Sequence, residues 1–103
     1  MALYARHAMN ILGDADAAAL EHDIKTQLAV RHALEIVGEA ASKISEQGRS
    51  SLPRLSWRSM VGMRNALIHG YAVVDLKRVV AVVRDDLPPL VAELDRLLGE
   101  QEP

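Results

Sequence analysis

The sequence predicts an all-α protein of four to five helices. Apolar residues recur at steps of three and four along several stretches, which is the spacing of one helix face. Residues that favour helix caps precede these stretches, and no segment shows the regular alternation typical of a half-buried strand. The 103 residues suffice for one hydrophobic core, so residues 1–103 are expected to form a single domain.

The first helix is predicted over Leu3–Leu12. Within it, Leu3, His7 and Ile11 recur at steps of four, as do Ala8 and Leu12. The following segment, Asp14–His22, is rich in Ala and acidic residues but has no apolar stripe. We therefore expect a connection that is partly helical.

The longest helix is predicted over Ile24–Glu46. Asp23 is a favourable N-cap, and Gly48 can end the run. Gly38 lies in the middle, where glycine costs about 1 kcal/mol relative to Ala, so we expect another backbone to approach closely there. The predicted buried stripe consists of Val30, Ala33, Leu34, Val37, Ala41 and Ile44.

A turn-rich segment, Gly48–Leu55, is predicted to be a loop. Ser56 then caps a third helix that begins at Trp57. The apolar stripe of this helix is interrupted by Arg64. A charge in such a stripe is paired, exposed at the helix edge, or directed into a pocket shared with a partner.

Two further helices are predicted near the C-terminus. Asp75 can cap the fourth helix, although the many Val residues that follow also suit a strand. Lys77, Arg78 and Arg84 lie between apolar positions at helical steps, which favours the helix. The fifth helix opens at Pro88-Pro89, because proline is tolerated in a first helical turn.

Composition restricts the class of protein. The chain has no Phe, one Trp and two Tyr, so small aliphatic side chains form its core, and burial in an oligomer would add stability. It has no Cys, which excludes disulfides, thiolate nucleophiles and thiolate metal ligands. Neither a signal sequence nor an apolar run long enough for a membrane span is visible, so we expect a soluble, unprocessed cytoplasmic protein.

One segment has a distinctive charge pattern. Residues 47–74, the acid-free segment, contain four Arg but none of the chain's 14 Asp and Glu residues, although the net charge of the chain is −2. Within the segment, Arg64, His69 and Tyr71 lie close together in sequence. Arg suits phosphate oxygens and His transfers protons near neutral pH, so the trio suggests chemistry on a phosphodiester.

Helix geometry separates two members of this trio. Arg64 and His69 are five residues apart, about 140° around a continuous helix. One solution is that Gly70 ends the helix, so that the loop folds Tyr71 and His69 back toward Arg64. Another is that two copies of the chain meet across a twofold axis.

Each residue of the trio also has an ordinary structural role. A His near a helix end can be a dipole partner, Arg at a helix edge is usually solvated, and Tyr after Gly is usually a packing residue. The remaining histidines, His7, His22 and His32, have no spacing typical of metal ligands. We expect no metal and no cofactor.

Several separated signatures resemble one family. In order along the chain they are Gly38-Glu39-Ala40-Ala41, Ser56-Trp57, Gly62-Met63-Arg64-Asn65, His69-Gly70-Tyr71, Val74-Asp75 and Leu87-Pro88-Pro89-Leu90. Together they are similar to the HepT-like branch of the HEPN superfamily. The resemblance runs from about Val30 to Leu90.

The resemblance implies an antiparallel helical bundle that forms a homodimer with a composite active site. It implies a metal-independent endoribonuclease toxin, silenced by a minimal nucleotidyltransferase antitoxin that attaches AMP to Tyr71. Arg64 and His69 would be catalytic, Tyr71 would contact RNA phosphate, and Asn65, Gly70 and Glu39 would support the site. The alternatives are a non-catalytic nucleotide-binding module and a helical protein that serves only as a structural partner of a nucleotidyltransferase.

Overall fold

The predicted fold class is confirmed: the chain is helical. The computed structural model describes the backbone of residues 1–69 and 75–101, with side chains for 1–69 and 75–97, and these ranges contain no strand. The elements are α1 (Ala2–Leu12), α2 (Ala17–Glu21), α3 (Ile24–Ser42), α4 (Glu46–Ser51), α5 (Trp57–His69), α6 (Leu76–Ala81), the π-helical segment η1 (Val82–Asp86) and α7 (Leu87–Gln101).

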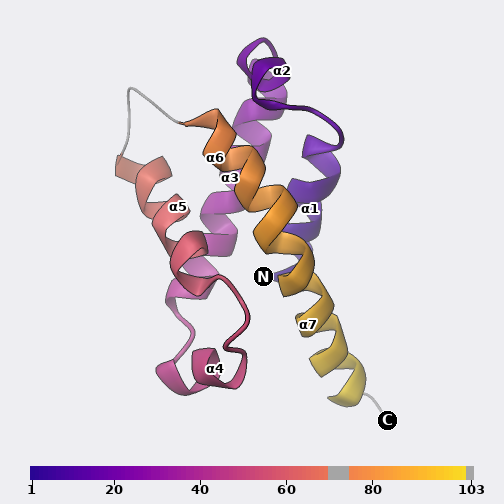
Figure 1. The fold of residues 1–103 in the computed structure, drawn as a ribbon, viewed down its shortest axis with the longest axis vertical. Coiled ribbons are helices and arrows are strands. Elements are labelled where there is room, and N and C mark those ends of the chain that lie inside the picture. Colours follow the sequence, from indigo (N-terminus) through magenta and orange to yellow (C-terminus); the bar gives the residue numbers. More distant parts are fainter. Residues whose placement is uncertain (70–74, 102–103) are drawn as a thin grey trace.

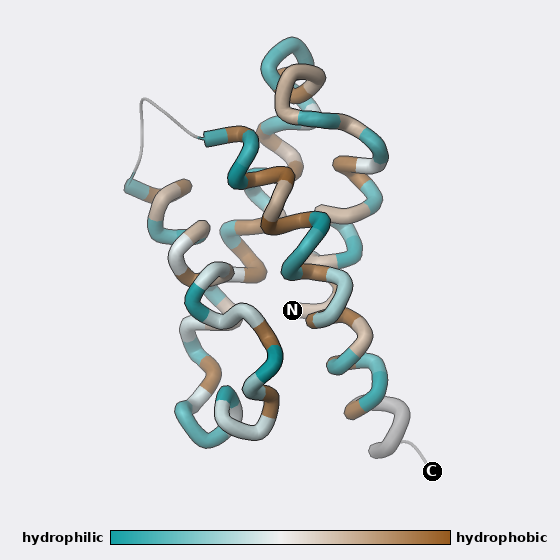
Figure 2. Tube along the Cα trace, viewed as in Figure 1, coloured by the Kyte–Doolittle hydropathy of each residue, from teal (hydrophilic) through white to brown (hydrophobic). Residues whose placement is uncertain are grey.

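Helix α3 is the central element of the bundle. It packs against α5 on one side and α1 on the other, while the run from α6 to α7 crosses in front of it (Figure 1). Hydrophobic and hydrophilic residues alternate along that run (Figure 2), as expected for helices with one buried face. The largest fully buried side chains are aliphatic or thioether: Leu20, Met60, Leu87, Leu90, Val30, Val37 and Val79.

Helix starts follow the predicted caps. The Asp23 carboxylate accepts hydrogen bonds from the Thr26 N–H at 3.1 Å and the Thr26 hydroxyl at 2.7 Å. Asp75 accepts from the backbone N–H groups of Lys77 and Arg78 at 3.0 and 3.3 Å. Both aspartates satisfy N–H groups that a helix start leaves without an intrahelical partner, which explains why these two predictions were confirmed.

The first helix buries a different face from the one that its large side chains suggest. Ala5, Ala8 and Leu12 are buried, whereas Leu3 and Ile11 are 58% and 39% exposed. Small side chains toward the core let α1 lie close to its neighbours. The stripe of larger residues therefore remains on the surface.

The predicted end of the long helix at Glu46 is wrong. Helix α3 stops at Ser42, and a new helix, α4, begins at Glu46 and extends into the segment expected to be a loop. The Ser45 hydroxyl accepts a hydrogen bond from the Gly48 N–H at 3.0 Å, so Gly48 lies within α4 and does not end α3. A serine N-cap at this point favours a fresh helix start over continuation.

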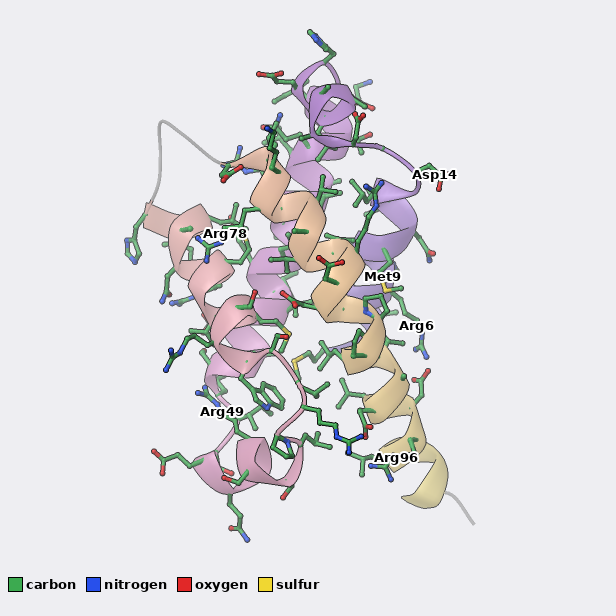
Figure 3. All side chains as sticks on the ribbon, in the orientation of Figure 1. Arg6, Met9, Asp14, Arg49, Arg78 and Arg96 are labelled. Carbon is green, nitrogen blue, oxygen red and sulfur yellow. The ribbon has the colours of Figure 1, made fainter. Side chains whose placement is uncertain are left out.

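Arg49 stabilises the end of α3. Its guanidinium donates hydrogen bonds to the carbonyls of Ala41 at 3.0 Å and Ser42 at 3.4 Å (Figure 3). The Ala41 carbonyl also accepts from the Ile44 N–H at 3.2 Å, and a positive charge is favourable at a helix C-terminus. One arginine of the acid-free segment therefore has a structural role.

The two predicted C-terminal helices form one continuous run, so the predicted break before Pro88 is wrong. The segment η1 joins them, and the Leu87 N–H donates to the Val82 carbonyl five residues back. Pro88 and Pro89 have no N–H, and their rings crowd the carbonyls four residues earlier. A wider π turn accommodates this defect without ending the helix.

The close approach predicted at Gly38 is confirmed. A Cβ atom at this position would overlap the Cβ of Arg64 and lie 2.8 Å from the Met60 carbonyl oxygen. Glycine therefore allows the backbones of α3 and α5 to come together. The contact places Arg64 directly over α3.

We expect Gly38→Ala to lower the free energy of unfolding by about 1–3 kcal/mol, because the obstructing atoms belong to or adjoin the α5 backbone. Thermal or urea unfolding measures this change. Gly62→Ala is the matched control, since its Cβ would meet only the mobile end of Arg78. Equal stability of the two variants would contradict the close contact.

Acid should weaken the α3 cap. The hydroxyl of Thr26, followed by its backbone N–H, holds the pKa of Asp23 below its ordinary value of 3.8. A lowered pKa in the folded state adds stability above 3.8 that is lost as the pH falls through the folded value.

Asp23→Ala should therefore lower Tm at neutral pH, and its difference from wild type should shrink in acid. Melting curves across a pH series check this expectation. Asp14→Ala removes an exposed carboxylate that caps no described helix, so it should not show the same convergence. A pH-independent difference for Asp23→Ala would contradict the cap.

Candidate functional site

Arg64 is held at the contact between α3 and α5. Its aliphatic stem covers Gly38, and its Nη2 atom lies 2.6 Å from Oε2 of Glu39. The Arg64 side chain is 27% exposed and that of Glu39 44%, so the pair lies at the edge of the core. Of the three possibilities for a charge in this apolar stripe, pairing is the one that occurs.

Asn65 holds the other end of the Arg64 guanidinium. Arg64 Nη1 donates to Asn65 Oδ1 at 2.8 Å, while the buried Nε has no hydrogen-bond partner among the residues that the structure describes. Each terminal nitrogen of Arg carries two N–H groups, so one on each remains for another acceptor. Glu39 and Asn65 thus orient a cation that retains donors at a partly exposed edge.

His69 is the last residue of α5 and is exposed. No hydrogen bond or ion pair joins it to Arg64 in the described part of the chain, in keeping with the 140° separation expected on a helix. Asn65 is four residues before His69 and therefore shares its face. The Arg64–Asn65 hydrogen bond therefore links the guanidinium to a side chain on the face of α5 that carries His69.

The structure thus brings together Glu39, Arg64 and Asn65, with His69 one turn beyond Asn65. The expected roles of Gly70 and Tyr71 fall outside the described residues. The described part of α5 extends to His69, so the predicted role of Gly70 in ending the helix stays a prediction.

The acid-free segment is less cationic in space than in sequence. Arg49 binds carbonyls at the end of α3, and Arg64 pairs with Glu39, which comes from outside the segment. Arg54 and Arg58 are exposed. The sequence analysis did not predict that Glu39 partly neutralises Arg64. The signal that could have predicted it is an acidic residue directly after Gly38, the glycine at which another helix approaches closely.

A shallow groove borders the Arg64–Glu39 pair. Its apolar lining consists of Ile36, Ala40 and Ile68, and Ile68 is 36% exposed. Charged residues in and directly after α3 complete the lining: Glu35, Glu39 and Lys43. Lys43 Nζ also lies 3.7 Å from Glu39 Oε1. The groove combines apolar area with charges of both signs.

The face of α5 that carries Gly62 has a feature that the sequence did not predict. The guanidinium of Arg78, from α6, lies over Gly62, where a Cβ would be 3.0 Å from its Nη2 atom. The signal was a second glycine in the middle of a helix, which favours close approach of another group as at Gly38.

Neither a metal site nor a membrane-spanning helix is found within the described ranges. No group of three or more His, Cys, Asp or Glu side chains there could hold a metal ion. None of the helices described is both long and apolar enough to cross a bilayer.

Comparison with known proteins places this arrangement in a family. The profile described as "Ribonuclease HepT-like" matches residues 1–97. A "Probable ribonuclease HepT" of Thermococcus cleftensis is 41% identical over 75 residues, which are 73% of this chain and 68% of that protein. No solved structure gives a significant match.

Two relatives from Methanocaldococcus jannaschii, each described as a "Putative RNase", extend the likeness. One is 40% identical over 67 residues, 65% of this chain and 62% of that protein. The other is 28% identical over 99 residues, 96% of this chain and 85% of that protein. With the profile match over nearly its whole length, the chain belongs to the HepT-like ribonuclease family.

Proposed function

We propose that the protein is a metal-independent endoribonuclease that uses the ribose 2′-hydroxyl as nucleophile. The observation that carries this proposal is the position of Arg64, whose guanidinium is held by Glu39 and Asn65 at a partly exposed edge with N–H donors to spare. Family membership supplies the class of reaction.

The reaction requires proton transfers and stabilisation of phosphate charge. A base removes the 2′-hydroxyl proton, the 2′-oxygen bonds to phosphorus, and the bond to the 5′-oxygen breaks as that oxygen takes up a proton. His69 is exposed and suits either proton transfer. Arg64 supplies fixed N–H donors for the charge that develops on the phosphate oxygens.

A composite site in a homodimer would supply both a base and an acid. One protomer contributes one His69, directed away from Arg64 by helix geometry. The groove beside Arg64 offers apolar area for a second copy, and α1 exposes Leu3, Tyr4 and Ile11 on the other side of α3.

Charges along α3 suit the same assembly. Glu35 and Lys43 lie eight residues apart, four on either side of Glu39, and both line the groove. If two α3 helices cross antiparallel near Glu39, each Glu35 faces a Lys43 of the other copy. A twofold axis there would bring the two motifs to one cleft.

We further propose that the protein is the toxin of a toxin–antitoxin pair, with a minimal nucleotidyltransferase as antitoxin. Tyr71 follows His69 by two residues and is the proposed RNA contact and AMP acceptor. An AMP group on Tyr71 would add an anionic phosphate two residues after His69. It would compete with substrate for the positive charge of Arg64.

We expect His69→Ala to reduce cleavage of single-stranded RNA by at least about 100-fold, because it removes the proton-transfer group. A gel assay with wild type and variant in the presence of EDTA measures this. DNA of the same sequence should remain intact, since it lacks the 2′-hydroxyl.

His22→Ala is the matched control, because His22 is an exposed histidine at the end of α2. Equal cleavage by wild type and His69→Ala would falsify the proposed mechanism. Tight nucleotide binding without any cleavage would favour the binding-module alternative.

The ion pair between Glu39 and Arg64 should contribute measurably to the free energy of unfolding. Glu39→Gln and Arg64→Gln are expected to be coupled in a double-mutant cycle of unfolding by about 0.5–1 kcal/mol, as for a partly exposed ion pair. Glu35→Gln serves as control, since Glu35 lines the same groove but makes no ion pair within the described ranges. Additive effects of Glu39→Gln and Arg64→Gln would rule out the positioning role.

A further inference from the structure

We propose that the outer face of α5 binds the RNA strand that flanks the scissile phosphate, with Arg58 and Arg78 as phosphate-binding residues. We define this face by Arg58, Gly62, Asn65 and His69. The proposal rests on the ribonuclease function proposed above and adds to it a path for the substrate.

Helical spacing places these four residues on one side of α5. They follow one another at steps of four, three and four residues, so they lie within about 60° around the axis. Arg58, Asn65 and His69 are exposed. The distance along the axis from Gly62 to His69 is about 10 Å, so the face leads directly to the proposed proton-transfer residue.

Arg78 adds a second cation to this face although it belongs to α6. Its guanidinium lies over α5 (Figure 3), and its Nη2 atom is 3.0 Å from the point that a Cβ at Gly62 would occupy. The missing side chain therefore makes room for Arg78. Its charge falls between Arg58 and His69 along the helix.

Neither cation is neutralised by a neighbouring carboxylate through any hydrogen bond or ion pair seen in the described ranges. Asp75 accepts from backbone N–H groups of α6, and Asp86 accepts from the Ser59 hydroxyl at 2.6 Å. By contrast, Arg6 pairs with Asp95, and Arg84 donates to the Ala15 carbonyl at 2.6 Å.

The charge pattern identifies the ligand class. Exposed guanidinium groups without acidic partners suit phosphate oxygens, which they can bind through two parallel N–H donors. The chain as a whole is acidic, with net charge −2, so attraction to RNA must come from such local cations. Two of them in line with His69 would hold a single strand with its next phosphate at the site.

The test is binding of a single-stranded RNA whose 2′-hydroxyls are methylated, so that the proposed reaction cannot cut it. Arg58→Gln and Arg78→Gln should each lower affinity about tenfold. Each should also reduce the slope of log affinity against log salt by about 0.7, the value for one phosphate contact on a single strand.

Lys77→Gln is the matched control. It removes the same charge from the residue next to Arg78, but Lys77 lines a hollow with Asp16 and Val80 on the α2 side of α6. Its affinity and salt slope should stay close to those of wild type. If the two arginine variants behave like Lys77→Gln, or if wild type does not bind the RNA, the proposal is overturned.

Gly62→Ala separates binding from stability. The added Cβ displaces only the mobile end of Arg78, and Ala favours the helix, so Tm should not fall. RNA affinity should fall as the guanidinium leaves the face. Unchanged affinity in Gly62→Ala together with unchanged affinity in Arg78→Gln contradicts the proposal.

Cleavage of unmodified RNA, measured in parallel, distinguishes this proposal from the ribonuclease function. Binding that depends on Arg78 without cleavage by wild type overturns the reaction and leaves the binding face. Cleavage with binding that is insensitive to both arginine substitutions overturns the binding face and leaves the reaction.

Discussion

The contact of α3 with α5 at Gly38 is the constraint on which the rest of the structure depends. Because this residue has no side chain, the Met60 carbonyl and the Arg64 stem approach the α3 backbone directly. Small aliphatic side chains fill the remaining core, and such cores rely on close backbone packing for contact area. One glycine therefore sets both the helix spacing and the position of the motif arginine.

That position determines how the Arg64 charge can be used. Close packing brings the guanidinium beside Glu39, the residue that follows Gly38, while the hydrogen bond to Asn65 directs it along α5. The guanidinium is therefore fixed in position and partly neutralised by Glu39, but it remains partly exposed to solvent. A substrate phosphate would meet donors that need no rearrangement, which is the condition for electrostatic stabilisation of a transition state.

Local chemistry explains the predictions that were confirmed. Asp23 and Asp75 cap helices with their own side chains. These features depend on residues within one turn of each other, so sequence reasoning can find them. The end of α3 was missed because Ser45 offers a competing helix start, to which Arg49 adds hydrogen bonds from seven to eight residues away.

The sequence by itself determined the helical class, the caps at Asp23 and Asp75, the close approach at Gly38 and the motif residues, because each follows from local spacing or side-chain chemistry. Only the tertiary structure decided that Glu39 neutralises Arg64 and that Arg78 crosses from α6 to Gly62 on α5. These contacts join residues 16 to 25 positions apart, and their geometry depends on how the helices pack. Periodicity identifies the face of a helix, but packing decides which charge from another helix lies beside it.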